Sequence, residues 1–203
     1  NYVAILKQSD IADPKIQGYL DILEAKAQRL KTLTEDVVEA SKVSSGNISL
    51  EYMDVDLVEM IQQTEGEMAE KFEARNLKMI MNLPAEPAVV HVDGRRMWRV
   101  LENIFGNAAK YAMPGTRVYA DLKLEEDTVD LSLKNVSEHQ LNISADELTE
   151  RFIRGDLSRS SEGSGLGLSI AQSLTTMQGG TFNLYLDGDL FRVNIRFPRV
   201  KKQ

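Results

Sequence analysis

Residues 102–111 read Glu-Asn-Ile-Phe-Gly-Asn-Ala-Ala-Lys-Tyr, and this stretch says most about the fold and the chemistry of the chain. Asn103 and Asn107 are four residues apart and Lys110 follows three residues later, so on a helix the three side chains share one stripe. Asparagine has mediocre helix propensity, which makes two on one helix face unexpected; a solvated polar face is the alternative explanation. The opposite face is apolar, with Val100, Leu101, Ile104, Phe105 and Ala108.

This polar stripe carries ligands suited to a phosphorylated molecule. A carboxamide oxygen is a hard donor that can ligate Mg²⁺, an ion that keeps several of its own waters. A lysine one turn further along can meet a phosphate. Asp93 precedes the stretch as a helix cap, and residues 113–115, Met-Pro-Gly, end it. We therefore expect a helix from Asp93 to about Ala112.

A second motif, Gly-Ser-Gly-Leu-Gly-Leu at residues 163–168, stands at the start of another predicted helix, Leu166 to Met177. Glycine lets a backbone approach a ligand closely, and a helix N-terminus attracts phosphate. The spacing fits neither a dinucleotide-binding fingerprint nor a Walker loop, because a polar loop precedes it and no Gly-Lys-Ser/Thr follows. Alone the motif is weak, since a flexible loop before a core helix reads the same way.

The N-terminal part of the chain predicts a helical hairpin. Apolar residues recur at gaps of three and four between Pro14 and Val43, which is typical of an amphipathic helix with a near-heptad seam. Residues 2–7 resemble the end of a preceding helix and residues 9–13 a turn. We expect two such hairpins to form a four-helix dimer; the alternative is that the seam packs on the same chain. The seam consists of Ile16, Leu20, Leu23, Ala27, Leu30, Leu33 and Val37.

Residues 44–47, Ser-Ser-Gly-Asn, form the predicted domain boundary, with a hairpin in residues 1–45 and a second domain in residues 46–203. Consecutive hairpins and helices in the second domain predict an α+β fold, a two-layer α/β sandwich and not a doubly wound parallel sheet. Predicted helices cover 57–75, 93–112 and 166–177, and predicted strands cover 48–53, 77–83, 88–92, 118–124, 129–133, 182–186 and 191–197.

Composition excludes several classes of protein. The 203 residues carry a net charge of −7, which argues against nucleic acid as the main partner. The chain has no cysteine, so disulfides are excluded. It has only two histidines, His91 and His139, so a multi-histidine metal site is disfavoured. The sequence holds no apolar run long enough to span a membrane. We expect His91 to have a structural role.

Together the motifs resemble the catalytic domain of sensor histidine kinases, in the ATPase superfamily that includes gyrase B, Hsp90 and MutL. Residues 103–111 look like the N box of that family and residues 163–170 like its second glycine box. Residues 150–159 resemble its phenylalanine box and lid, and the hairpin resembles its dimerisation and histidine-phosphotransfer domain. The resemblance covers about residues 48–198, and the hairpin adds the residues before them.

The resemblance implies the superfamily's left-handed-crossover sandwich, with ATP and Mg²⁺ as ligands. It assigns Asn107 to Mg²⁺, with Asn103 beside it, and assigns Lys110 and Tyr111 to phosphate or ribose. Asn103, Asn107 and Lys110 are the implied catalytic residues. The implied nucleotide-contacting residues are Asn103, Asn107, Lys110, Tyr111, Asn135, Arg154, Arg159, Gly163, Ser164, Gly165, Leu166, Gly167 and Leu168.

The sequence departs from the family at the first glycine box, Asp-x-Gly-x-Gly. Asn135 replaces the adenine-recognising aspartate, and Ser137 and His139 replace the glycines. An asparagine oxygen can accept the adenine amine, but the bond becomes neutral and weaker. We expect the chain to bind nucleotide despite this change; the alternative is that nucleotide binding is impaired.

The implied activity is transfer of the ATP γ-phosphoryl group to a protein histidine and then to a response-regulator aspartate. Neither His91 nor His139 fits the acceptor, which we expect upstream of Asn1. Asn103 stands where hydrolysing relatives have a glutamate, and Glu102 points off the stripe by about 100°. The resemblance implies a homodimer, a receiver-domain partner at the hairpin, and the cytoplasmic portion of a membrane-anchored bacterial sensor. The rivals are a pseudokinase scaffold and an ATP-hydrolysing relative.

Overall fold

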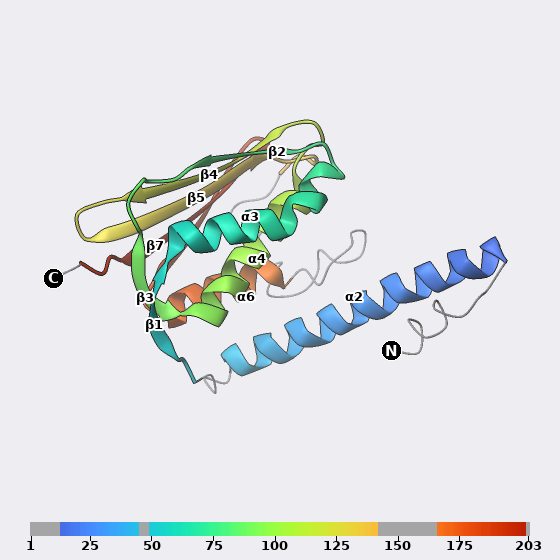
Figure 1. Cartoon of the computed structure of the whole chain (residues 1–203), viewed down its shortest axis with the longest axis horizontal. Coiled ribbons are helices and arrows are strands. Elements are labelled where there is room, and N and C mark those ends of the chain that lie inside the picture. Colours follow the sequence, from blue (N-terminus) through green and yellow to red (C-terminus); the bar gives the residue numbers. More distant parts are fainter. Residues whose placement is uncertain (1–12, 45–48, 142–165, 202–203) are drawn as a thin grey trace.

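The computed structural model describes residues 13–44, 49–141 and 166–201. A long N-terminal helix precedes an α/β body, in which helix α6 separates the hairpin β4–β5 from the hairpin β6–β7 (Figure 1). The elements are α2 (Pro14–Ser44), β1 (Tyr52–Asp56), α3 (Leu57–Glu73), β2 (Lys78–Asn82), β3 (Val89–Asp93), α4 (Gly94–Tyr111), β4 (Arg117–Leu124), β5 (Thr128–Val136), α6 (Gly167–Met177), β6 (Thr181–Asp187) and β7 (Leu190–Pro198).

The α/β body has two layers. Its main sheet has the order β2-β4-β5-β7-β6, in which β2 is parallel to β4 and the other pairs are antiparallel. Alternate residues of β4, β5 and β7 are buried, as expected for a sheet covered on one face. Helices α3, α4 and α6 cover that face (Figure 1), so the core lies between sheet and helices.

Asp93 fixes the start of α4, the helix that carries the asparagines. Its carboxylate accepts hydrogen bonds from the backbone N–H groups of Arg96 (3.1 Å) and Glu51 (3.0 Å). Burial by itself raises the pKa of Asp93, but these backbone hydrogen bonds and the nearby Arg96 charge outweigh it, so the pKa lies below its ordinary value. The backbone N–H of Asp93 donates to Gln178 Oε1 (2.9 Å), which joins the start of α4 to the end of α6.

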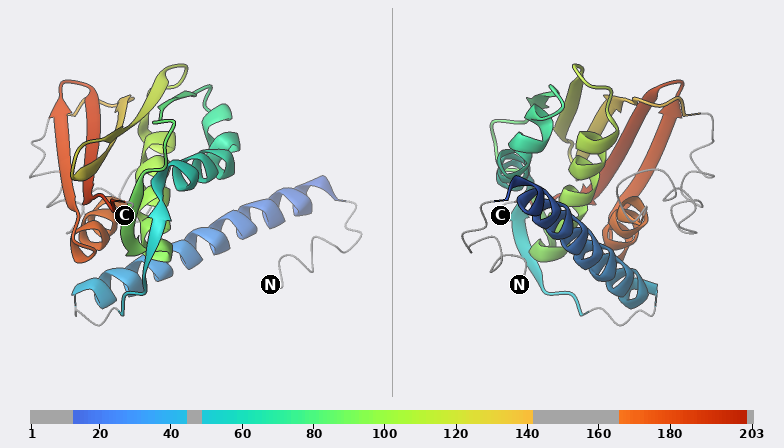
Figure 2. Two further views of the ribbon diagram at one scale, coloured as in Figure 1. Left: turned by 60° about the vertical axis from the view of Figure 1, so that its left-hand side comes forward. Right: turned by 90° about the vertical axis from the view of Figure 1, so that its right-hand side faces the viewer.

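Helix α2 runs beside the α/β body and extends beyond it, as Figures 1 and 2 show. Its C-terminal half contacts the body through α6 and through an ion pair between Asp36 and Arg99 of α4. Most of the predicted seam is exposed, including Leu23 (54%) and Leu30 (65%), whereas Leu20 is buried. None of the described helices is long and apolar enough to cross a lipid bilayer.

The predicted elements are confirmed, with two corrections. The first strand lies at residues 52–56 and not 48–53, because it pairs with β3 in the register Tyr52–Asp93 to Asp56–Val89. These two strands form a separate two-stranded sheet, which the sequence pattern did not indicate. The helix predicted for residues 57–75 ends at Glu73, before Asn76 with a φ of 52°. The partner helix of the predicted hairpin lies outside the described residues.

Candidate nucleotide-binding site

Helix α4 has the two faces that the sequence predicts. Its apolar side chains, together with Met97 and Ala109, are buried in the core, while Asn103, Asn107 and Lys110 remain partly exposed on the other side. Asn103 Nδ2 donates to the Arg99 carbonyl (2.9 Å), which leaves Asn103 Oδ1 as an acceptor directed away from its own helix.

The two predicted motifs meet at Gly167. A Cβ added to this first residue of α6 would lie 2.8 Å from Asn103 Oδ1, closer than real side chains approach. The missing side chain therefore allows the N-terminus of α6 to lie against the carboxamide of Asn103. Helices α4 and α6 pack against each other, and this contact brings a glycine-rich helix N-terminus to a face of amide side chains.

The altered first glycine box, which begins with Asn135 near the end of β5, lies at the C-terminal end of α4. Met113 N donates to Val136 O (2.9 Å), and Glu138 N donates to Tyr111 O (2.8 Å). Ala112 and Ser137 form an isolated β-bridge. The structure thus brings the N-box-like helix and the altered first glycine box together.

Asn135 is buried, with 3% of its surface exposed, on the β5 face that the helices cover. Its Nδ2 donates to the carbonyl of Val136 (3.1 Å), so the amide nitrogen has a partner and the oxygen is the atom left to accept. The side-chain oxygen of Asn135 is therefore available to accept a further hydrogen bond.

Lys110 and Tyr111 form one unit at the end of α4. Lys110 Nζ donates to the Tyr111 hydroxyl (2.8 Å) and lies 4.6 Å from the centre of the Tyr111 ring. The ring and the hydroxyl together hold the ammonium group in place. This arrangement keeps a positive charge on the same helix as the two asparagines.

Several predicted site residues lie outside the described part of the chain: Arg154, Arg159, Gly163, Ser164 and Gly165. Of the remaining glycine-box residues, Leu166 occupies the N-cap position of α6 and Gly167 begins the helix. Leu168 is buried in the core, so its backbone N–H, and not its side chain, is the group that could face a ligand.

Arg99 is a residue of this region that the sequence analysis did not single out. Its guanidinium is 2.5 Å from Asp36 of α2 and 2.5 Å from Glu102, and its carbonyl accepts the Asn103 amide. It therefore connects the asparagine face of α4 to the long N-terminal helix. Its position four residues before Asn103 indicates that it lies one helical turn from that residue. Sequence spacing could not predict its pairing with Asp36.

His91 is exposed and links the two strands of the small sheet. Its Nδ1 lies 2.7 Å from Asp54 Oδ1, and its ring stacks on Tyr52 at a centroid distance of 5.5 Å. These contacts lie outside the asparagine face, and the structural role of His91 stays a prediction. His139 is also exposed, and its backbone N–H donates to Ser137 Oγ (3.3 Å).

The residues of α4 fit Mg²⁺ held mainly by phosphate and water. The described residues contain no group of three or more His, Asp or Glu that could form an all-protein cage. Asn107 is partly exposed. Mg²⁺ retains several waters and binds through few protein ligands beside substrate phosphates, so a single carboxamide on this helix face suits it.

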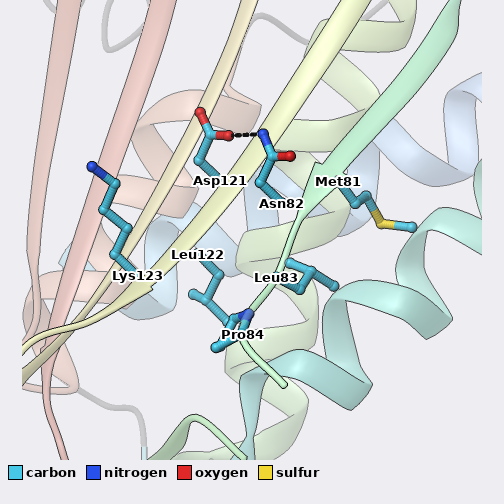
Figure 3. A pocket seen from close by; sticks show the side chains of 7 residues that line it. All are labelled: Met81, Asn82, Leu83, Pro84, Asp121, Leu122 and Lys123. Atoms are coloured by element: carbon cyan, nitrogen blue, oxygen red, sulfur yellow. Dashed lines mark hydrogen bonds between the residues drawn. The ribbon is translucent and has the colours of Figure 1, made fainter. Parts of the chain in front are cut away.

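A separate open hollow lies at the β2 edge of the main sheet (Figure 3). Asn82 donates to Asp121 there, and Lys134 Nζ lies 2.8 Å from Asp121. Burial by itself raises the pKa of Asp121, but these two partners outweigh it, so its pKa lies below the ordinary value. The hollow contains none of the predicted site residues, and its carboxylate already has partners.

A family profile described as "Histidine kinase-, DNA gyrase B-, and HSP90-like ATPase" matches residues 92–200. The chain is 28% identical over 201 residues to the sensor protein VanSC of Enterococcus gallinarum, covering 98% of this chain and 55% of that protein. It is 27% identical over 195 residues to the sensor histidine kinase MtrB of Mycobacterium tuberculosis, covering 94% of this chain and 34% of that protein. The chain therefore spans about half or less of these relatives.

Solved structures share the fold. The histidine kinase ShkA, solved at full length with AMPPNP, gives a TM-score of 0.80 at 19% identity over 99% of this chain and 42% of that chain. The histidine kinase ThkA in complex with the response regulator TrrA gives 0.68 at 20% identity, over 97% and 55%. At these identities the likeness concerns the fold. With the family profile matching more than half of its residues, and with the asparagine helix and glycine-led α6 in contact, the chain belongs to the histidine kinase-, DNA gyrase B- and HSP90-like ATPase family.

Proposed function

We propose that this chain is the catalytic ATP-binding part of a sensor histidine kinase, which transfers the γ-phosphoryl group of ATP to a protein histidine for relay to a response-regulator aspartate. The contact between Gly167 and Asn103 carries the proposal. It joins a helix N-terminus, which attracts phosphate, to amide oxygens that suit Mg²⁺.

In this proposal the residues of α4 bind and orient the nucleotide. Asn107 would hold Mg²⁺, which neutralises phosphate charge during transfer. Asn103, fixed by its hydrogen bond to Arg99 O, would sit beside it. Lys110 and Tyr111 would contact phosphate or ribose, and Asn135 would accept the adenine amine through Oδ1. The lid residues Arg154, Arg159, Gly163, Ser164 and Gly165, with the α6 backbone, would complete the site.

The chemistry of Asn103 favours transfer over hydrolysis. A carboxamide cannot take a proton from water, so it cannot serve as the general base that hydrolysis requires. Glu102, the nearest carboxylate in sequence, pairs with Arg99 at 2.5 Å. An ATP-hydrolysing role would therefore need a base that α4 does not supply.

The wider arrangement follows from α2. We propose that residues 1–45 are the C-terminal part of a dimerisation and phosphotransfer hairpin and residues 46–203 the catalytic domain. The exposed seam of α2 would pair with a second copy, and a receiver domain would dock on the hairpin. The ThkA structure with its response regulator supports the last point by its fold likeness. Anchoring in a membrane would come from segments outside this chain.

Calorimetric titration with Mg²⁺ and a non-hydrolysable ATP analogue tests the proposal. We expect a Kd near or below about 100 μM, equivalent to about −5.5 kcal/mol. Asn107→Ala should abolish this binding, because it removes the proposed Mg²⁺ ligand. A matched control is Gln63→Ala on α3, an exposed residue whose side chain donates to Glu67 of its own helix, and it should bind as the wild type does.

Absence of binding up to millimolar analogue would contradict the kinase proposal and favour a pseudokinase that serves as a scaffold. The observation behind that rival is the altered first glycine box, in which neutral Asn135 replaces a carboxylate. Asn135→Asp separates the two readings, since it should strengthen binding if base recognition is intact and change nothing in a scaffold. Steady phosphate release without an acceptor would instead revive the hydrolysing rival.

A further inference from the structure

Arg75 joins three segments at the C-terminal end of α4. It follows α3, and its side chain is 25% exposed. Its Nη1 donates to the carbonyl of Lys110, its Nη2 donates to the carbonyl of Ala112 at 3.0 Å, and Nη2 also pairs with the Glu138 carboxylate. One guanidinium thus binds the last turn of α4 and the segment after β5.

These contacts surround Tyr111. The carbonyls on either side of it, those of Lys110 and Ala112, accept from Arg75, and the carbonyl of Tyr111 itself accepts from Glu138 N at 2.8 Å. The last carbonyls of a helix have no partner within the helix. Here one arginine and the backbone of its ionic partner satisfy three consecutive carbonyls.

The backbone strengthens the same junction. Gly115 N donates to Arg75 O (3.2 Å), and Lys78 N donates to Thr116 O (3.0 Å). The turn after α3 is therefore bonded to the loop after α4 at both the side-chain and the main-chain level. The planar fork of an arginine can bind several oxygens at once, which a lysine cannot reproduce.

We infer that Arg75 and Glu138 are positioning residues for Lys110 and Tyr111, acting through the end of α4 without touching the nucleotide. The expected effect on nucleotide binding rests on the proposed function, whereas the role of Arg75 in fixing the end of α4 does not. The charge of Arg75 is offset by Glu138, and its donors are committed to carbonyls, so its role is to fix where the Lys110 ammonium and the Tyr111 hydroxyl stand. This deepens the proposed site, because Arg75 lies outside the recognised motifs and its partner Glu138 lies within the altered first glycine box.

Amide hydrogen exchange of the free protein tests the structural part. Arg75→Ala should speed exchange at Met113 and Glu138, whose N–H groups donate to Val136 O and Tyr111 O across this junction, and at Ala112, whose N–H donates to Ala108 O in the last turn of α4. Exchange in α6 and β7 should be unchanged. Arg75→Lys should fall between Arg75→Ala and the wild type. The control is Arg117→Ala, an exposed arginine at the start of β4. Unchanged exchange at the three amides would overturn the inference whatever the nucleotide does.

Titration with Mg²⁺ and the ATP analogue tests the consequence. We expect Arg75→Ala to raise the Kd about five- to tenfold, since charge-assisted hydrogen bonds hold the end of α4, and Glu138→Gln to raise it less. In a background of Lys110→Ala with Tyr111→Phe, Arg75→Ala should add less than twofold, because its effect passes through those two side chains. A merely structural role would give the same factor in both backgrounds and would overturn the inference.

The two failures are distinguishable. If the wild type binds nucleotide and Arg75→Ala changes only the exchange rates, the positioning role is overturned while the proposed function stands. If the wild type binds no nucleotide, the proposed function fails and the positioning role fails with it. Slower exchange in the wild type than in Arg75→Ala would then show only that Arg75 stabilises the end of α4.

Discussion

Gly167 lies so close to Asn103 that any side chain at this position would collide with the carboxamide, because a Cβ would stand 2.8 Å from Asn103 Oδ1. The first residue of α6 and the polar face of α4 therefore form one surface. The constraint on this glycine is the close approach of the Asn103 side chain and not the backbone conformation, since its φ is not in the left-handed region.

We predict that Gly167→Ala weakens nucleotide binding by at least tenfold while the protein stays folded, because the new methyl must displace the Asn103 amide. Calorimetry with the ATP analogue and a thermal unfolding curve measure the two effects. Gly66→Ala is the matched control: this glycine lies within α3 with no atom near an added Cβ. It should keep the wild-type affinity and gain about 0.5–1 kcal/mol of stability. Equal affinity of Gly167→Ala and wild type would contradict the proposed site.

The sequence predicted the elements that have strong local signals. Asp93 as a cap, the apolar face of α4 and the alternation in β4, β5 and β7 each depend on residues close in sequence. For the same reason the asparagine stripe and its glycine partner were identifiable as motifs before their contact was known.

Long-range pairings were not predictable in this way. β1 was placed four residues early because its register depends on β3, far along the chain. Arg75 and Arg99 read as ordinary charged residues, since their partners Glu138 and Asp36 are distant in sequence. What decides their role is a contact between elements, and single-sequence patterns carry no such information.

Asp36 and Arg99 form a polar link between α2 and the α/β body. The Asp36 side chain is 6% exposed and lies 2.5 Å from Arg99. Breaking a buried pair costs about 3–5 kcal/mol when one charge is left alone. Arg99 keeps Glu102 as a partner and is 22% exposed, so we predict a smaller cost of about 1–2 kcal/mol for Asp36→Ala.

Amide exchange across α2 measures this link. Asp36→Ala should speed exchange in the C-terminal half of α2 and leave β5 and β7 unchanged. Glu35→Ala is the control, because Glu35 is exposed and pairs with Lys31 of its own helix at 3.9 Å. If both variants behaved alike, the ion pair would not be holding α2 against α4.

Asp93 gives the stability a defined dependence on pH. Its pKa in the folded state is lowered, because backbone hydrogen bonds from Glu51 and Arg96 outweigh burial. Its contribution is therefore fully present above the unfolded-state pKa of about 3.9 and is lost as the pH falls through the lowered folded-state pKa.

We predict that Asp93→Asn is less stable than wild type by about 1–2 kcal/mol at pH 7, since one of two accepting oxygens becomes a donor. Urea unfolding at pH 7, 5, 4 and 3 should show the gap constant down to about pH 5 and shrinking below about pH 4. A gap that grew at low pH would contradict the assignment of the lowered pKa to the carboxylate.

The exposed seam of α2 predicts self-association. Leu23, Leu30 and Val37 recur every seven residues and are 54%, 65% and 57% exposed, an arrangement that a second helix can cover. We predict that the chain is a dimer at micromolar concentration and that Leu30→Glu shifts it to monomer, because a carboxylate would be buried in the interface. Sedimentation equilibrium measures both states. Gln28→Glu adds the same charge about 160° around the helix from Leu30 and should leave the dimer intact. A wild-type monomer, or a dimer that tolerates Leu30→Glu, would show that this seam does not join two copies.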